Sequence, residues 1–230
     1  MSIGYFDARG VSPRDYAQYQ LPHYLRSRLP KNADACLIDY GCGFGQIMLA
    51  LKKIGYLNVN GIDVDEKAIA HCRAVGLNIL RPDIADLNAY MGICDFVIMS
   101  HVLEHIPKEK IIPILKSVRE LLKPSGELMI MVPNAQSVTG CYWAYEDFTH
   151  TTLFTCGSIS YVLRMAGFGK IQIIDIDATA GLSFLNRLLR KSFYFGYNLW
   201  ASILNKMLGS SFHSGGLQCF SYEVKVIAAK

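Results

Sequence analysis

The stretch LIDYGCGFGQIML, residues 37–49, joins a strand-like apolar run to a helix-like run through three glycines in five positions. Glycine inside a strand or a helix costs about 0.5–1 kcal/mol relative to alanine. The three glycines therefore indicate that another group approaches this backbone closely. In doubly wound α/β folds, a glycine-rich turn between a parallel strand and the next helix is where nucleotides bind. This one stretch predicts both a fold class and the place of a ligand site.

The segments around this turn alternate between strand and helix from Cys36 to Asp177. Apolar runs typical of buried strands occur at residues 36–41, 59–65, 77–86, 94–106, 127–134 and 170–177. Helical patterns lie between them at residues 45–54, 66–76, 108–126 and 157–169. Pro113 lies inside the third of these patterns, which leaves the start of that helix open between Lys108 and Pro113. The alternation predicts an α/β fold with a parallel sheet covered by helices on both faces.

Composition narrows the class of protein. The chain has 230 residues, of which 51% are apolar and 18% charged, so it can bury a core and is not a disordered chain. A positive mean hydropathy of +0.22 indicates some exposed apolar surface. The net charge is +4, without a dense run of Lys and Arg, so we expect no nucleic-acid partner.

Cysteines and the N-terminus bear on the cellular compartment. The seven cysteines include no C-x-x-C pair, which favours small buried side chains in a reducing compartment over disulfides or zinc. The first residues, MSIGYFDARG, contain no secretory signal pattern. We therefore expect a cytoplasmic protein.

The glycine spacing indicates which nucleotide the turn accepts. Gly41, Gly43 and Gly45 follow G-x-G-x-G, and Gln46 stands where the dinucleotide fingerprint has its last glycine. Asp39 lies two residues before the first glycine, where it would oppose a pyrophosphate but suit an ammonium group. These residues favour a nucleoside attached to a cationic amino acid over NAD.

Acids after the next two strands supply the rest of a nucleoside site. Asp63 follows Gly43 by 20 residues and can accept hydrogen bonds from both ribose hydroxyls. Asp83 follows the next strand, where a carboxylate can accept from the exocyclic amine of adenine, and its neighbour Ile84 can pack on the ring. Ordinary loop and capping roles are the alternative for both acids.

The segments DYGCGFG, GIDVD, RPDIAD, CDFVIMSHVLEHI and LLKPSGELMIMVPN occur in this order. Together they resemble the motif series of class I S-adenosylmethionine-dependent methyltransferases, over about residues 22–177. The resemblance implies a Rossmann-like, doubly wound sheet of seven strands, mostly parallel with the last strand antiparallel, and helices on both faces. It also implies S-adenosylmethionine as the cofactor.

By this resemblance, Asp39 lies near the methionine ammonium, Asp63 holds the ribose, and Ser100 with His101 borders the methyl group. The full set of expected cofactor-binding residues is Asp39, Gly41, Cys42, Gly43, Gly45, Asp63, Val64, Asp83, Ile84, Ser100 and His101.

A second cluster, YWAYEDFTHTTLFT at residues 142–155, follows the fifth strand. Its aromatic and acidic residues suit a sugar, and the residues expected to bind such a substrate are Tyr142, Trp143, Tyr145 and Glu146. A loop whose aromatics merely cover the core is the alternative. The DFTH and FT strings resemble methyltransferases encoded with bacterial surface-polysaccharide and glycolipid pathways.

Methyl transfer to a hydroxyl requires a base. We expect His150 to be that base, with Asp147 orienting it or contacting the acceptor and His101 as a further catalytic candidate. Residues 101–105, HVLEH, also match an inverted zinc-protease signature, but no third ligand motif accompanies them. We therefore expect no metal, and we expect Glu104 and His105 to stabilise a turn.

The remaining residues divide around this core. We expect a helical lid at residues 1–35, a catalytic core at 36–177 and 218–230, and a helical, aromatic-rich insertion at 178–217. The longest uncharged run of the insertion, residues 192–205, is too short for the ~20 residues that span a bilayer. Residues 182–208 could contact a membrane surface at the inner face, form a homodimer contact, or pack on the domain.

The leading functional hypothesis is O-methylation of a sugar hydroxyl on a glycan, or on a lipid-linked or nucleotide-linked sugar. One alternative is a small aromatic, quinone or lipid acceptor, and another is a non-catalytic partner subunit that binds the cofactor. No N-P-P-Y-type string follows the fourth strand, which argues against methylation of nucleic-acid amines.

Overall fold

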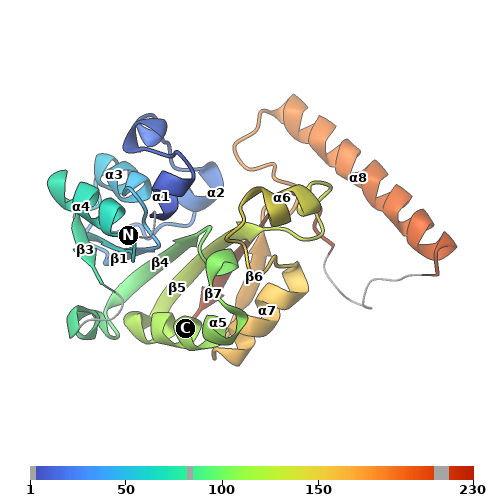
Figure 1. Ribbon diagram of the computed structural model, residues 1–230. Coiled ribbons are helices and arrows are strands. Elements are labelled where there is room, and N and C mark those ends of the chain that lie inside the picture. The colour runs from blue at the N-terminus through green and yellow to red at the C-terminus, as the bar shows by residue number, and fades with distance from the viewer. Residues whose placement is uncertain (1–3, 82–84, 210–217) are drawn as a thin grey trace.

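A computed structural model describes residues 4–81, 85–209 and 218–230 of the chain (Figure 1). Its centre is a seven-stranded sheet with the strand order β3-β2-β1-β4-β5-β7-β6. The strands are β1 Leu37–Tyr40, β2 Val59–Ile62, β3 Asn78–Leu80, β4 Cys94–Ser100, β5 Leu122–Pro133, β6 Ile171–Ile174 and β7 Glu223–Ala229. Only β7 runs antiparallel to its neighbours, β5 and β6. The predicted seven-stranded, mostly parallel sheet with a reversed last strand is confirmed.

Helices cover both faces of the sheet (Figure 1). On one face α3, Gln46–Lys53, and α4, Glu66–Ala74, bury side chains such as Met48 and Ile69. On the other face α5, Lys108–Leu121, and α7, Cys156–Met165, bury Leu115 and Leu163. The remaining helices are α1 Tyr5–Ala8, η1 Pro13–Tyr16, α2 His23–Arg26, η2 Ala85–Tyr90, η3 Leu103–His105, α6 Gly140–Glu146 and α8 Phe184–Met207.

The structure fixes the start of α5, which the sequence left open, and its end differs from the sequence pattern. The helix begins at Lys108 and contains Pro113, rather than starting at the proline. Proline lacks the N–H that would bond the carbonyl of Glu109, and that residue is exposed, so water can satisfy its carbonyl. The helix also ends at Leu121, because residues from Leu122 onward already belong to β5.

The cysteines behave as small apolar side chains. All seven are free thiols and six of them are buried, with Cys141 exposed.

Among the helices of the described residues, none is both long and apolar enough to cross a bilayer.

The glycine-rich turn lies at the switch point of the sheet. β1 pairs with β2 on one side and with β4 on the other, so chain order reverses across its carboxyl end. In open α/β sheets ligands bind in the crevice at this point. The fold therefore places residues 41–45 beside the ends of β2 and β4.

Gly45 joins this turn to α3. It has φ +79°, and a Cβ added there would lie 2.4 Å from Leu77 Cδ1 and 3.1 Å from Cys72 Sγ. Both neighbours are buried, so they have little room to move aside. Gly45 thus lets the start of α3 pack directly against α4 and the residue before β3.

We predict that Gly45→Ala destabilises the protein more than Gly76→Ala does. Gly76 has a similar φ of +75° but nothing within 4 Å of an added Cβ, so it reports backbone strain alone, about 1–2 kcal/mol. Gly45→Ala adds the displacement of two buried side chains, about 1–3 kcal/mol more. Urea unfolding measures both variants, and equal losses would contradict the packing role of Gly45.

Candidate active site

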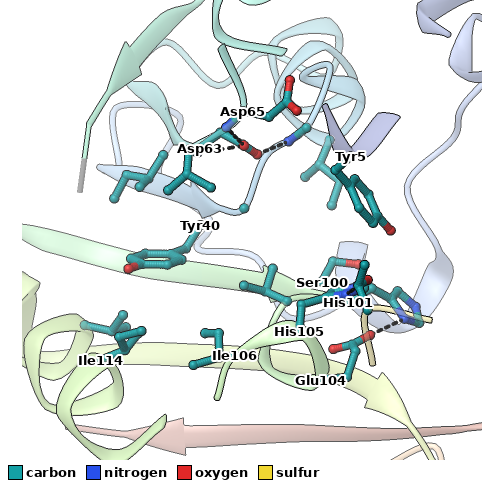
Figure 2. A pocket seen from close by; sticks show the side chains of 18 of the residues that line it. Tyr5, Tyr40, Asp63, Asp65, Ser100, His101, Glu104, His105, Ile106 and Ile114 are labelled. Carbon is teal, nitrogen blue, oxygen red and sulfur yellow. Dashed lines mark hydrogen bonds and ion pairs between the residues drawn. The ribbon is translucent and has the colours of Figure 1, made fainter. Parts of the chain in front are cut away.

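A cavity of about 1210 Å³ lies at the carboxyl ends of β1, β2 and β4 (Figure 2). Its walls combine the turn after β1, the ends of β2 and β4, residues of η2 and α5, and the segment from Trp143 to His150. Tyr5 and Arg9 from the N-terminal segment and Tyr222 next to β7 close its other end. Segments far apart in the sequence thus meet around one space.

Two glycines bring the backbone close to this cavity. Gly41 has φ +81°, and a Cβ there would lie 2.3 Å from Val102 Cγ2. Gly43 has φ +52°, and its added Cβ would lie 3.1 Å from Phe6 Cζ. Both line the cavity, whereas Cys42 and Gly45 are buried and do not. The turn therefore presents bare main chain to a ligand at positions 41 and 43.

Asp63 lies at the end of β2 and lines the cavity. Its Oδ2 accepts a hydrogen bond from Gly43 N at 2.7 Å, and its Oδ1 accepts from Val64 N at 2.7 Å and Asp65 N at 2.9 Å. These bonds fix the carboxylate and leave acceptor capacity on Oδ2 for a hydroxyl of a ligand. Val64 also lines the cavity and is exposed.

Asp39 is the least satisfied acid of the site. It is 1% exposed, and neither of its carboxylate oxygens has a hydrogen-bond partner in the described part of the chain. Burial, with a smaller contribution from the charge of Asp63, raises the pKa of Asp39 to about 8. Asp39 itself does not line the cavity, but Tyr40 and Gly41 beside it do. A buried carboxyl without a partner at this turn fits the ammonium group of a cationic ligand.

His101 directly follows β4 and has a φ of +54°, which is unusual for a residue other than glycine. Its Nδ1 lies 3.1 Å from Glu104 Oε1, and its Nε2 lies 2.9 Å from Glu223 Oε1. Burial disfavours the imidazolium, but hydrogen bonds to the two buried carboxylates outweigh it and raise the pKa of His101 to about 10. His101 is therefore charged at neutral pH and has no free nitrogen to accept a proton.

Two charged residues of the last strand, Glu223 and Lys225, extend the hydrogen-bonded group around His101. Lys225 is 2% exposed, and its Nζ lies 3.7 Å from Glu223 Oε2 and 3.2 Å from Asp175 Oδ2. It also lies 4.7 Å from the centre of the Tyr24 ring. The sequence reasoning did not single out Glu223. The only signal available was a pair of charged residues inside an otherwise apolar strand pattern.

His150 lies on the opposite wall. Its side chain is 7% exposed and lines the cavity. Its Nδ1 lies 2.6 Å from the carbonyl oxygen of Trp143, so Nδ1 carries the hydrogen. In the neutral ring Nε2 is then the acceptor, and it lies 4.0 Å from Asp147 Oδ2, too far for a hydrogen bond.

Asp147 is held by groups from both sides of the cavity. Its Oδ1 accepts from Thr149 N at 3.0 Å and from Thr149 Oγ1 at 2.6 Å. Its Oδ2 accepts from the Tyr5 hydroxyl at 2.8 Å and pairs with Arg9. Burial opposes ionisation, but these hydrogen bonds and the charge of Arg9 lower the pKa of Asp147. The carboxylate of Asp147 therefore holds Tyr5 and Arg9 of the N-terminal segment at the cavity wall.

His105 is a second histidine that the sequence analysis had assigned to a turn. Its Nδ1 lies 2.8 Å from Thr149 Oγ1, and that hydroxyl donates its hydrogen to Asp147. His105 therefore donates from Nδ1, and Asp147 orients it through Thr149, while the carbonyl of Trp143 orients His150. Burial lowers the pKa of His105, which keeps it neutral.

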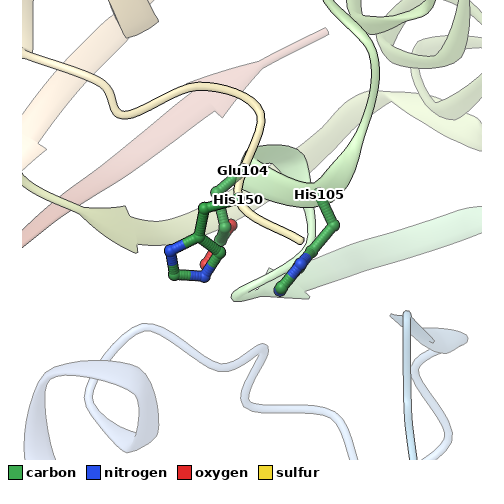
Figure 3. A group of neighbouring side chains, drawn as sticks. All are labelled: Glu104, His105 and His150. Carbon is green, nitrogen blue, oxygen red and sulfur yellow. The ribbon is translucent and has the colours of Figure 1, made fainter. Parts of the chain in front are cut away.

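The two histidine rings lie side by side, with centroids 4.8 Å apart. One ligand atom each of Glu104, His105 and His150 lies within 4.8 Å of the others (Figure 3). Glu104 already bonds His101, and each histidine uses Nδ1 in a hydrogen bond. The two Nε2 atoms remain as acceptors on this wall, together with Glu104 Oε2, which is buried and has no hydrogen-bond partner among the described residues.

The other residues that the sequence predicts for the site fall into three groups: those that line the cavity, those that do not, and those outside the described residues. Trp143, Glu146 and Ser100 line the cavity. Tyr142 and Tyr145 do not line it and are exposed, so they neither face a ligand here nor cover the core. Residues 140–146 form α6 rather than a loop. Asp83 and Ile84 lie outside the described residues.

The chain is similar to known methyltransferases. A family model described as a methyltransferase domain matches residues 14–173. A curated relative, the ribosomal protein L11 methyltransferase of Shewanella baltica (strain OS195), is 32% identical over 125 residues. That match covers 50% of this chain and 40% of the relative, so the chain spans less than half the length of the curated relatives it matches.

Solved structures share the fold. A SAM-dependent methyltransferase from Archaeoglobus fulgidus aligns with a TM-score of 0.60 at 22% identity, covering 86% of each chain. Phosphoethanolamine N-methyltransferase 2 of Haemonchus contortus, in complex with S-adenosyl-L-methionine, aligns with a TM-score of 0.56 at 16% identity. That alignment covers 90% of this chain and 51% of the other.

Asp39 makes the stability of the protein depend on pH in a defined direction. An aspartate in an unfolded chain has a pKa of about 3.9, whereas burial raises the pKa of Asp39 to about 8 in the folded protein. The folded state therefore binds this proton more tightly. The contribution of this proton to the free energy of unfolding is fully present below pH ~4 and is lost as the pH rises toward ~8.

We predict that Asp39→Asn removes this loss, so that the unfolding free energy of the variant falls less than that of the wild type between pH 4 and pH 8. Asp34→Asn, at an exposed position, is the control and should keep the wild-type profile. Denaturant unfolding at several pH values measures the difference. Parallel profiles for the wild type and Asp39→Asn would show that Asp39 is not a buried, unpaired acid.

Proposed function

Since the chain belongs to the methyltransferase domain family and uses S-adenosylmethionine as its methyl donor, we propose that it methylates a hydroxyl group of a sugar. The observation that carries the proposal is a half-buried histidine, His150, whose Nδ1–H is held by a carbonyl and whose Nε2 is left as an acceptor on the cavity wall. An amine acceptor can react without such a base, whereas a hydroxyl must lose its proton.

The residues of the glycine turn fit the cofactor. We assign Asp39 to its ammonium group, Asp63 to its ribose, and the main chain at Gly41 and Gly43 to its amino-acid part. When bound, the cofactor supplies a methyl group on a positively charged sulfur, and the protein must align a nucleophile with it. These assignments rest on the orphaned oxygens of Asp39, the anchored carboxylate of Asp63 and the absence of side chains at positions 41 and 43.

His101 is a positioning residue in this proposal. Its charge alone would repel a sulfonium, but Glu104 and Glu223 each contribute a negative charge to the same hydrogen-bonded group. The group of three therefore carries a net charge of about −1 and can stand beside a cationic ligand. Its two hydrogen bonds also hold the backbone at the end of β4.

His150 acts as the general base. Its Nε2 would take the proton of the acceptor hydroxyl as the oxygen bonds to the methyl carbon, while the methyl–sulfur bond of the donor breaks and S-adenosylhomocysteine leaves. The Trp143 carbonyl holds the ring in the required tautomer, and the ionised Asp147, 4.0 Å from Nε2, stabilises the imidazolium that results.

The acceptor end of the cavity suits a sugar. The rings of Trp143 and Tyr222 lie 6.3 Å apart with an angle of 43° between their planes, so they offer apolar surface to one side of a sugar ring. Glu146 and Arg9 line the same region and can bond hydroxyl groups.

A flat phenol or quinol is the second candidate acceptor. The same aromatic residues would stack on its ring, and its hydroxyl would also need a base. A non-catalytic subunit is less well supported, because it has no use for a free histidine nitrogen on the wall opposite the cofactor turn.

The acceptor class can be tested with methyl-labelled S-adenosylmethionine and panels of nucleotide sugars, free glycans, simple phenols, quinols and amines. The proposal expects a labelled methyl group on a member of the sugar panels, detected by mass spectrometry, and none on the amines. Labelling confined to phenols or quinols would favour the second candidate, and labelling confined to amines would overturn both.

We predict that His150→Gln lowers turnover of the acceptor so identified by about 10²–10⁴-fold, because the base is lost. The affinity for S-adenosylhomocysteine, measured by calorimetry, should stay within about twofold, because His150 does not touch the glycine turn. Tyr145→Ala, an exposed neighbour outside the cavity, is the control and should keep turnover. Full turnover in His150→Gln together with loss in His105→Gln would transfer the role of base to His105.

A further inference from the structure

Helix α8, Phe184–Met207, lies along the outer edge of the molecule, beyond α6 (Figure 1). None of its residues is buried. The half-buried residues recur every three or four positions and therefore share one face: Tyr194, Tyr197, Asn198, Ala201, Leu204 and Asn205. On this face the Tyr197 ring packs on Phe220 with centroids 4.9 Å apart. The rather polar face is thus the one turned toward the protein.

The opposite face of α8 is apolar and exposed. Trp200 is 57% exposed and Phe195 74%, and the same face carries Leu185, Leu188, Leu199 and Ile203. A surface helix of a globular protein normally turns its apolar face toward the core. In α8 the arrangement is reversed, and a contiguous apolar surface of this kind marks an interaction site.

The charge of α8 has one sign. The helix contains Arg187, Arg190, Lys191 and Lys206 and no acidic residue, and all four basic residues are exposed. The whole chain has 23 Lys and Arg residues against 19 Asp and Glu residues. Once the four basic residues of α8 are set aside, the remaining basic and acidic residues balance. The entire net charge of +4 therefore resides on this helix.

This charge selects among the partners that could cover the apolar face. A second copy of α8 would bring four positive charges against four, without an acid on either helix to pair with them. A negatively charged lipid surface attracts the same four residues while Trp200, Phe195 and the leucines enter the boundary between headgroups and acyl chains.

We propose that α8 docks the protein onto the surface of a membrane rich in anionic lipids. The helix lies in the plane of the interface with its apolar face in the lipid, and its polar face holds the catalytic domain on the aqueous side. This inference concerns binding alone, so it does not rest on the acceptor or on the reaction proposed above.

Vesicle flotation of the full-length protein tests the proposal. Vesicles of phosphatidylcholine alone are compared with vesicles that also contain phosphatidylglycerol, at low and high salt. Two double variants address the two features of the helix: Leu188→Glu with Trp200→Glu, and Arg187→Glu with Lys191→Glu. Leu57→Glu is the matched control, because Leu57 is 74% exposed on a different part of the surface.

We expect the wild type and Leu57→Glu to float with the anionic vesicles and to be released by salt. The apolar-face variant should lose binding. In the charge variant each substitution changes the charge by two units, at about fivefold per unit, so binding should weaken by on the order of 25-fold per residue. All substituted positions are exposed, so the melting temperatures should match that of the wild type.

Wild-type protein that stays in the soluble fraction with anionic vesicles would overturn the proposal. Binding that is equal on both vesicle types and insensitive to salt would overturn the role of charge. Light scattering without vesicles addresses self-association. If it shows a wild-type dimer that Leu188→Glu with Trp200→Glu converts to a monomer, the apolar face is a contact between copies of the chain instead.

Discussion

The close approach of two turns organises the whole site. The turn after β1 passes so near the turn after β4 that a side chain at Gly41 would overlap Val102. Because residue 41 has no Cβ, the ends of the two central strands come together, with Asp39 and Gly43 on one and Ser100 and His101 on the other. The part of the cavity that we assign to the cofactor lies where these strand ends meet, at the switch point of the sheet.

Around this point the protein has placed more negative charge than it neutralises. Three carboxylates, those of Glu104, Glu223 and Asp175, face only two positive charges, those of His101 and Lys225, and the carboxyl of Asp39 has no partner in the described part of the chain. Buried carboxyl groups without full pairing are unfavourable for the protein by itself. A cationic ligand would offset this cost, which is why we propose that the ammonium of the methyl donor lies beside Asp39 and its sulfonium near the end of β4. The same arrangement explains why a pyrophosphate cofactor does not suit this glycine turn.

The sequence predicted the parts of the structure that short-range patterns determine. Strand and helix periodicity predicted an α/β fold with a parallel sheet, and the family resemblance added the seven strands and the reversed last strand. The glycine spacing and Asp63 indicated a turn that the structure places on the wall of the cavity. The contacts that complete the acceptor wall are not short-range. Arg9 and Asp147 are 138 residues apart, and His101 and Glu223 are 122 apart. No local pattern indicates that Thr149 links Asp147 to His105, or that the Trp143 carbonyl sets the tautomer of His150. For residues 178–217 the sequence predicted a helical, aromatic-rich insertion, but only packing could show that an apolar face of α8 is turned outward.

The most direct measurement is a crystal structure of the protein with S-adenosylhomocysteine, which keeps the ammonium, ribose and adenine of the methyl donor. The account predicts the ammonium beside Asp39, the ribose hydroxyls on Asp63, and the sulfur between the end of β4 and the wall that carries His150. An ordered ligand elsewhere, or an ammonium far from Asp39 with its carboxyl still unpaired, would contradict it.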